Sequence, residues 1–129
     1  MATAGHPLGG VKAFSGFSVD DMDAAKKFYA DVLGVRVLEE NGMLFLNFTD
    51  RDVLIYPKPN HVPATYTVLN FPVADVESAV DQLAAAGVNF EHYEGTQVET
   101  DAKGVFRGGG PLIAWFTDPA GNVLSVIQE

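Results

Sequence analysis

The spacing of apolar residues follows the same order twice, in residues 14–42 and again in residues 68–95. Each stretch opens with apolar residues at alternating positions, which predicts a strand. Apolar residues spaced by three and four then predict an amphipathic helix. The helical positions are Met22, Ala25, Phe28, Tyr29 and Val32 in the first copy, and Val76, Ala79, Val80, Leu83 and Ala86 in the second. The chain is therefore expected to hold two copies of one structural unit.

Both predicted helices are flanked by residues that cap helix ends. Asp20 or Asp21 precedes the first helix and Asp75 precedes the second. An aspartate at this point accepts a hydrogen bond from a backbone N–H of the first turn. Gly34 and Gly87 follow the helices, and glycine adopts the left-handed conformation that ends a helix at little cost. Each helix is therefore expected to run from its aspartate to its glycine.

Three more strands are expected after each helix. They cover residues 35–40, 43–49 and 52–57 in the first copy, and 88–94, 111–117 and 122–128 in the second. Residues 118–122, Asp-Pro-Ala-Gly-Asn, predict the tight turn before the last strand. The pattern favours an α+β fold, with a first βαβββ module in residues 11–60 and a second in residues 61–129, in one compact domain. Each module has a helix on one sheet face, and the other faces are expected to form a curved mixed sheet around a cavity.

Composition and charge limit the class of protein. The 129 residues include no cysteine, which excludes disulfides and thiolate metal sites and fits a cytoplasmic protein. No apolar run approaches the roughly 20 residues that span a bilayer, and the N-terminus does not read as a secretory signal, so no membrane partner is expected. The formal net charge of −9 disfavours nucleic acid as a partner and favours a cationic small molecule.

The paired modules resemble the vicinal oxygen chelate superfamily, which includes glyoxalase I, extradiol dioxygenases, fosfomycin-resistance enzymes and bleomycin-binding proteins. The resemblance covers nearly the whole chain, and its most specific segments are VDDMDAAKKFYADVLG (19–34) and WFTDPAGNVLSV (115–126). In metal-using members, His, Gln or Glu ligands come from the first and last strands of each module. The resemblance places these ligand positions at Phe14, Val68, Ser125 and Ile55, or at Tyr56 if the register slips by one.

The side chains at these positions do not form a metal site. A divalent ion needs several imidazole, carboxylate or thiolate donors that converge. Phenylalanine, valine and isoleucine offer none, and the Ser125 hydroxyl is a weak ligand. The three histidines, His6, His61 and His92, do not fall at ligand spacing. No metal and no other cofactor is therefore expected; a metal enzyme with ligands at unusual positions is the alternative.

Strand alternation assigns an aromatic lining to the cavity instead. The expected ligand-binding residues are Phe14, Phe45, Asn47, Tyr66, Asn70, Phe106, Arg107, Trp115 and Ser125. Most of them occupy inward positions of strands, whereas Phe106 and Arg107 belong to residues 96–111, a long connection of the kind that forms lids. Aromatic rings with a few polar groups are typical of a pocket for an organic molecule.

Two functions from different classes stay open. The resemblance favours a metal-free binding protein of the bleomycin-resistance type, which sequesters an antibiotic or another small organic molecule that is cationic or aromatic. Such relatives are homodimers, so a homodimer is expected here, with residues 5–10 as an arm that reaches the partner. The alternative is a metal-independent lyase or isomerase with an acid or base in the cavity, such as a glutamate, Tyr66 or His92. Nucleophilic catalysis is not supported, because the sequence offers no serine beside a histidine in a plausible nucleophile elbow and no Gly-x-Ser-x-Gly motif, and no catalytic residue is assigned.

Overall fold

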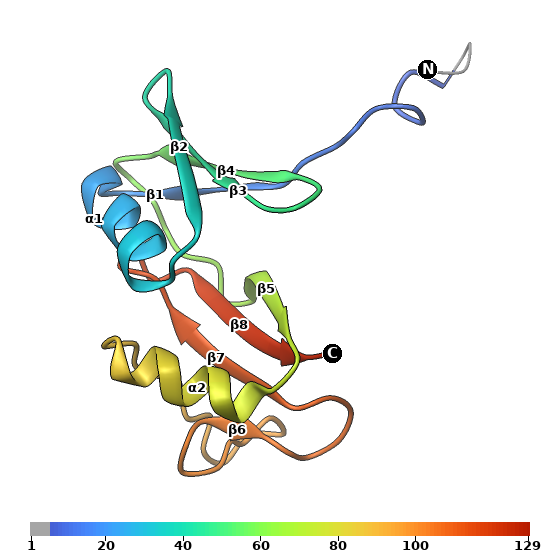
Figure 1. The fold of residues 1–129 in the computed structure, drawn as a ribbon, viewed down its shortest axis with the longest axis vertical. Coiled ribbons are helices and arrows are strands. Elements are labelled where there is room, and N and C mark those ends of the chain that lie inside the picture. The colour runs from blue at the N-terminus through green and yellow to red at the C-terminus, as the bar shows by residue number, and fades with distance from the viewer. Residues whose placement is uncertain (1–5) are drawn as a thin grey trace.

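The computed structural model describes residues 6–129 and has two four-stranded mixed sheets, each with its own helix (Figure 1). The first module contains β1 (Gly16–Val19), α1 (Met22–Lys27), η1 (Phe28–Val32), β2 (Arg36–Glu40), β3 (Met43–Asn47) and β4 (Asp52–Pro57). The second contains β5 (Thr67–Val73), α2 (Val76–Ala85), β6 (Val105–Phe106), β7 (Ile113–Thr117) and β8 (Val123–Gln128). The sheet orders are β1-β4-β3-β2 and β5-β8-β7-β6, and the predicted α+β fold of two βαβββ modules is confirmed.

The helices begin where the aspartates predict. Asp21 Oδ1 accepts a hydrogen bond from the Ala24 amide at 3.0 Å, and Asp75 Oδ1 accepts one from the Ser78 amide at 3.1 Å. The predicted glycine after each helix has a positive φ, 72° in the first module and 98° in the second. Within the described part of the chain, neither helix is long and apolar enough to cross a membrane.

The first helix finishes as a π-helical turn, η1, which the sequence pattern does not reveal. The Leu33 amide donates to the Phe28 carbonyl oxygen, five residues earlier, at 2.9 Å. The wider turn lets two adjacent rings reach the core, since Phe28 lies 6.5 Å from the ring of Phe116 and Tyr29 lies 6.1 Å from that of Phe17. π turns of this kind are rare and occur mainly as single turns inside α-helices.

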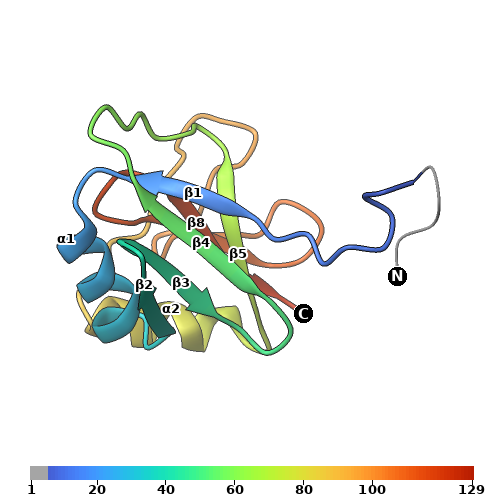
Figure 2. The same ribbon diagram turned by 90° about the horizontal axis from the view of Figure 1, so that it is seen from above.

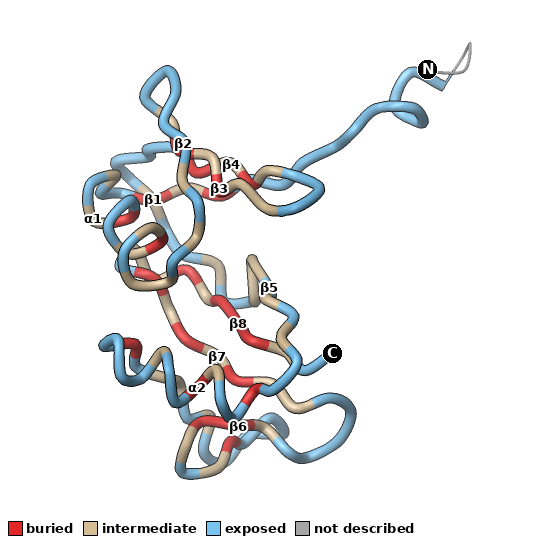
Figure 3. Tube along the Cα trace, in the orientation of Figure 1, coloured by how far each residue is buried: buried red, intermediate tan, exposed pale blue. Residues whose placement is uncertain are grey.

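Each sheet has one buried face, under the helix, and one face turned away from the helix, which we call the open face (Figure 3). Alternate residues along a strand point to opposite faces, so the buried positions identify the helix side. The buried apolar strand residues are Phe17, Val19, Leu44, Leu46, Val53 and Ile55 in the first sheet, and Val105, Ala114, Phe116, Leu124 and Val126 in the second. Ser125 is also buried but alternates with Leu124 and Val126, so it lies on the open face. Ile55 therefore lies on the helix side, and the expectation that it faces the cavity is wrong; Leu54 and Tyr56 are on the open face.

The predicted strand at residues 88–94 is also wrong. Phe90 makes only an isolated bridge to Phe116, and the Glu91 amide donates to the Trp115 carbonyl at 2.7 Å. The edge strand of the sheet is instead β6, two residues long, from within the connection that was expected to be a loop. The apolar residues at 88 and 90 alternate because both side chains face the core, and not because the segment pairs with a strand. Val88 is buried, and Phe90 packs against the core without a strand ladder.

The two modules share one core at their junction. Besides the Phe28 contact with Phe116, the rings of Phe48 and Phe71 pack edge to face at 5.9 Å. Phe116 and Phe71 belong to the helix side of the second sheet, so the modules meet through that side. The open faces of the two sheets carry predicted site residues from the strands, namely Phe45, Asn47, Asn70, Trp115 and Ser125.

The first described residues form an exposed arm that leads into β1. Residues 6–15 are exposed throughout, and Figures 1 and 2 show them extending away from both modules. Leu8, Val11 and Phe14 are large apolar side chains on this arm. Residue 5, the start of the expected dimer arm, lies outside the described residues. An arm that exposes three large apolar side chains gains stability when another surface covers them.

Candidate functional site

An aromatic cluster on the open face of the second sheet has Trp115 at its centre. The ring of Tyr93 lies 5.3 Å from that of Trp115 at a steep angle, and the ring of Phe106 lies 6.0 Å away. Trp115 comes from β7, and Phe106 from β6, where it pairs with Ile113. All three rings are partly exposed. The cluster therefore offers flat apolar surface on which an organic ring can stack.

Two hydrogen-bonded pairs supply polar groups beside this cluster. Trp115 Nε1 donates to Thr67 Oγ1 at 3.1 Å, and Ser125 Oγ donates to Asn70 Oδ1 at 2.6 Å. Trp115 and Ser125 are direct neighbours in the ladder between β7 and β8, and Ser125 is also the ladder partner of Asn70. Ser125 is fully buried and Asn70 is exposed. The amide nitrogen of Asn70 is thus the polar group that a ligand can reach most readily.

A β-bulge in β5 decides which residue stands beside Trp115. The pairing of β5 with β8 shifts between Thr67 and Leu69, so Thr67 shares the open face with Trp115. Val68, which the resemblance placed at a ligand position on the open face, packs against the core instead. Thr67 was not predicted as a site residue, because a bulge inverts strand alternation and leaves no clear mark in the sequence.

The other predicted site residues lie apart from the cluster. Phe45 and Asn47 are on the open face of the first sheet, where Asn47 Nδ2 donates to Asp52 Oδ1 at 2.7 Å. Phe14 and Tyr66 are 58% and 71% exposed, just before β1 and β5. The single chain therefore brings Phe106, Trp115, Asn70 and Ser125 together. Phe14, Phe45 and Tyr66 lie elsewhere on the surface, and Asn47 lies with Asn70 along the groove described below.

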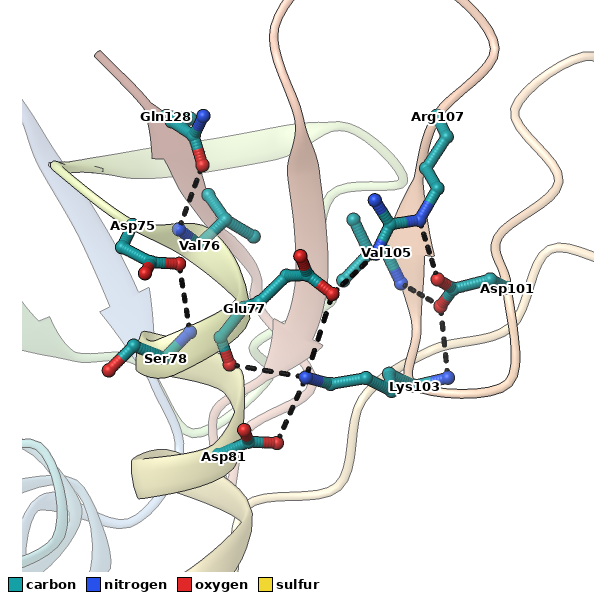
Figure 4. A network of polar contacts seen from close by, with 10 residues as sticks. All are labelled: Asp75, Val76, Glu77, Ser78, Asp81, Asp101, Lys103, Val105, Arg107 and Gln128. Carbon is teal, nitrogen blue, oxygen red and sulfur yellow. Dashed lines mark hydrogen bonds and ion pairs between the residues drawn. The ribbon is translucent and has the colours of Figure 1, made fainter.

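Arg107 is held by carboxylates on the outer side of α2 (Figure 4). Arg107 Nε donates to Asp101 Oδ2 at 2.8 Å, and Arg107 Nη2 donates to Glu77 Oε1 at 2.7 Å. Lys103 adds a contact of 3.1 Å between its Nζ and Asp81 Oδ1. Burial alone would raise the pKa of the Asp101 carboxyl, but hydrogen bonds from Arg107 and from backbone amides outweigh it, and the pKa is lowered. These ion pairs, which we call the α2 clamp, fasten residues 101–107 to the helix.

Residues 101–107 contribute both to the α2 clamp and to the aromatic cluster. Phe106, beside the clamped Arg107, carries a ring that contacts Trp115. Gly104 lies in the turn between Asp101 and β6 with a φ of 94°, and a Cβ there would stand 2.7 Å from Phe90 Cβ. The connection predicted as a lid is therefore anchored at residues 101–107 by charge and by close packing.

Tyr93 is the titratable group of the cluster. Burial raises the pKa of its hydroxyl, and the nearby Glu91 carboxylate raises it further. The hydroxyl therefore stays neutral at physiological pH and is a poor base. The same carboxylate places negative charge close to the Tyr93 ring of the cluster, a combination that favours a cationic ligand.

A serine and a histidine meet on the open face of the first sheet. Ser18 Oγ lies 2.6 Å from His61 Nδ1, although 43 residues separate them. Within residues 6–129, His61 Nε2 is buried and has no hydrogen-bond partner. The linker after β4 folds back over β1 and brings the two residues together, a contact that local sequence does not show. Ser18 lies within β1 and not in a nucleophile elbow. This pair has the groups for proton transfer.

The residues at the usual ligand positions do not fit a divalent metal. Phe14 is exposed, Val68 and Ile55 pack into the core, and the Ser125 hydroxyl already donates to Asn70. Among residues 6–129, no three His, Cys, Asp or Glu side chains lie close enough together to hold an ion. Tyr56, the alternative to Ile55, is on the open face but offers only a phenol hydroxyl. The donor set therefore lacks the imidazoles and carboxylates that such an ion requires.

A groove of about 830 Å³ lies at the junction of the two modules. Asn47 and Asn70 lie along it, but Trp115 and Ser125 do not line it. Most of its wall comes from the helix side of the second sheet, from α2, and from the turns before β2 and after β3. Its volume is within the range of small-molecule pockets.

Comparisons with known proteins agree with this architecture. The sequence model of the Glyoxalase/Bleomycin resistance protein/Dioxygenase superfamily matches residues 13–126. Similar solved structures include a lactoylglutathione lyase from Agrobacterium tumefaciens (TM-score 0.64, 21% identity, 94% of this chain and 95% of that one) and a glyoxalase family protein from Enterococcus faecalis (TM-score 0.68, 21% identity, 93% and 98%). An integron cassette protein from V. cholerae gives a TM-score of 0.62 at 24% identity, over 94% and 98%. No curated protein sequence matches.

Proposed function

Because the chain belongs to the Glyoxalase/Bleomycin resistance protein/Dioxygenase superfamily, we propose that it is a metal-free binding protein that sequesters a small organic molecule with aromatic or apolar parts. The ligand belongs to the antibiotic or natural-product class, and it is released chemically unchanged. Superfamily membership alone does not decide this, since one fold hosts several chemistries and a lactoylglutathione lyase is among the similar structures.

The observation that carries the proposal is the surrounding of Trp115. Its ring lies between Tyr93 and Phe106, with Thr67 bonded to its indole nitrogen. A flat, cationic molecule can stack on these rings. It can also accept a hydrogen bond from the Asn70 amide and is attracted by the nearby Glu91 carboxylate. The Tyr93 hydroxyl of the cluster has a raised pKa and is therefore a poor base, so it does not supply proton abstraction at this site.

A homodimer completes the site in this proposal. The open face of the first sheet leaves Leu38 40% exposed and Tyr56 38% exposed, beside the partly buried Phe45. An uncovered apolar sheet face of this kind is typical of a protein–protein contact. A second copy that covers it, with the exposed arm reaching across, brings Phe14 and Phe45 of one chain toward the aromatic cluster of the other. Light scattering of the purified protein should give twice the 13.8 kDa chain mass; a monomer would exclude this part of the proposal.

The second candidate is a metal-independent lyase or isomerase, and the Ser18–His61 pair favours it. A histidine with a short hydrogen bond to serine can take a proton from a substrate and return it at another atom. Tyr66 and His92, the other candidates for this role, are exposed, and His92 Nδ1 lies 3.1 Å from the Asp101 carbonyl oxygen. The pair is therefore the group on which an enzymatic function would depend.

The two functions are separated by the fate of a bound molecule. Natural products that raise the melting temperature are identified first, and each is incubated with the protein and recovered for mass analysis. Binding alone returns the molecule with its mass and chromatographic retention unchanged. A new product that forms with the wild type but not with His61→Ala supports the enzyme. Phe106→Ala should weaken binding in either case, whereas Val62→Ala, at a site 83% exposed, serves as the control.

A further inference from the structure

The groove at the module junction shares Asn70 with the candidate site at Trp115, but none of the three rings of the aromatic cluster lines it. It is bounded on one side by β5 and α2 and on the other by residues 33–36 and 48–51 of the first module. Phe116 and Val126 line it from the core of the second sheet. A molecule in this groove contacts both modules at once, on the side where their helices lie. The groove therefore calls for an explanation independent of Trp115.

The walls of the groove are apolar and incompletely buried. Leu69 and Phe71 of β5 and Ala79 and Leu83 of α2 all pack against the core, yet each remains partly exposed. These side chains sit around about 830 Å³ of space, which is enough for a small organic molecule but too little for a folded partner. Filling the groove with an apolar body removes these side chains from water.

The rim of the groove carries cations, which is unusual for this chain. The whole protein has 8 Lys and Arg against 17 Asp and Glu, but the rim holds Arg36 and Arg51 against Asp50 alone. The Arg51 Nε to Asp50 Oδ1 distance is 3.9 Å, with both side chains largely exposed, so this pair holds the guanidinium weakly. A carboxylate or sulfonate at the rim can form the stronger paired hydrogen bonds that guanidinium groups make.

We propose that the junction groove is a second ligand site, which takes an organic anion with an apolar body. The body lies against Leu69, Phe71 and Leu83, and the anionic head lies at the rim beside Arg36 and Arg51. Its charge preference is opposite to that of the cluster around Trp115, where Glu91 favours a cation. A ligand in the groove ties the first module to α2 and β5 of the second and stabilises their packing.

The probe is decanoate, with the uncharged 1-decanol as its matched control. An aliphatic chain fits the apolar groove but cannot stack on the aromatic cluster. The two probes differ only in the head group, a carboxylate or a hydroxyl. Two-dimensional amide spectra of the full-length protein locate the binding. Saturable shifts are expected at Gly34, Thr49 and Gln82, which line the groove, while the Trp115 indole signal stays in place.

Charge variants test the role of the rim. Arg36→Gln and Arg51→Gln should each weaken decanoate binding about twofold to fivefold, as expected for an exposed ion pair, and leave decanol unchanged. Both arginines are exposed, so these variants should fold. Lys58→Gln, at an exposed lysine outside the groove, is the control and should have no effect.

Any of three results overturns the proposal: no saturable shift at the groove amides, equal affinity for decanoate and decanol, or full affinity in both arginine variants. Decanoate shifts confined to the Trp115 indole would place the molecule in the aromatic cluster and also overturn it. If decanoate does not bind in the groove, the function proposed for the cluster at Trp115 still stands. The groove is monitored by its backbone amide signals and the cluster by the Trp115 indole signal.

Discussion

The Tyr29 hydroxyl donates a hydrogen bond of 2.8 Å to Asp118 Oδ2, which joins the helix of the first module to the last turn of the second across 89 residues. Both residues are buried. Asp118 also accepts bonds from the amides of Ala120 and Asn122 and from Asn122 Nδ2, while Asn122 Nδ2 also donates to the Ser18 carbonyl at 3.0 Å. The turn between β7 and β8 is therefore fastened to both β1 and η1.

Removal of the Tyr29 hydroxyl should weaken the contact between the modules. Tyr29→Phe keeps the ring but takes one donor from a buried carboxylate, which typically costs about 1.5–3 kcal/mol of unfolding free energy. Urea denaturation at pH 7 measures the loss. Tyr66→Phe, at an exposed tyrosine, should change stability by less than about 0.5 kcal/mol. Equal stability of both variants and the wild type would show that the bond does not support the junction.

The same hydroxyl should make stability sensitive to alkali. Burial raises the pKa of Tyr29 far above its usual value of 10.0, and the Asp118 carboxylate raises it further. A raised folded-state pKa means that the contribution is complete below the unfolded pKa and is lost as pH rises above it. The wild type should therefore lose stability above about pH 10 more steeply than Tyr29→Phe. Parallel curves of stability against pH for the two proteins would contradict this account.

A methyl group at Gly104 should disturb the segment that carries Phe106. The backbone there has a positive φ, and the added Cβ would stand 2.7 Å from Phe90 Cβ. Gly104→Ala should cost about 3 kcal/mol, from backbone strain and overpacking together. Gly95→Ala is the control, because Gly95 has a similar φ of 74° but no heavy atom within 4 Å of the new Cβ, so only the strain of about 1 kcal/mol applies. Equal thermal stability of the two variants would contradict the packing argument.

The helices and most strands could be predicted because their signals are local. The capping bonds of Asp21 and Asp75, and the turn at residues 118–122, depend on residues within one turn of each other, so periodicity and residue type suffice. The strand at 88–94 failed because Val88 and Phe90 alternate for burial alone. Alternation of apolar and polar residues shows which side chains face the core. It does not show whether a neighbouring strand is present for backbone pairing.

The candidate site was harder to predict because it depends on contacts between distant segments. Strand facing and loop length predict Trp115, Phe106, Asn70 and Ser125 as candidate site residues, and the structure places these four near one another. Thr67 was missed because of a bulge, and Tyr93 because its segment is not a strand. Arg107 could not be paired with Glu77 from sequence, since 30 residues separate them. The Ser18–His61 contact had no local signal of any kind.

The α2 clamp should make the cluster sensitive to acid. The pKa of Asp101 is lowered, mainly by Arg107 once the opposing effect of burial is overcome. A lowered folded-state pKa means stability that is present above the unfolded pKa of 3.8 and is lost as pH falls through the folded value. Arg107→Gln should therefore flatten the loss of stability as pH falls from above 3.8 to below it. Arg51→Gln, with its single weak contact, should behave as the wild type in the same urea titrations; an identical acid response of all three proteins would exclude the clamp.

Restoring a carboxylate at the position of Ser125 should not create a metal site. Ser125→Glu places a charge in a fully buried position without a partner, at a cost of about 3–5 kcal/mol. Asn70→Glu puts the same group at the exposed neighbour, where the change should stay within about 1 kcal/mol. Calorimetry with Zn²⁺ and Ni²⁺ should detect no stoichiometric binding to either variant. Tight binding to Ser125→Glu would show that other ligands are in place and that the metal-free account is wrong.

The most direct test of the central claim is a fluorescence titration. Trp115 is the only tryptophan, so its emission reports the aromatic cluster alone. A natural product selected by thermal shift should change that emission saturably, with a dissociation constant that Phe106→Ala raises and a metal chelator leaves unchanged. A tight ligand that leaves the emission of Trp115 unaltered, or whose binding disappears with the chelator, would contradict a metal-free organic site at this cluster.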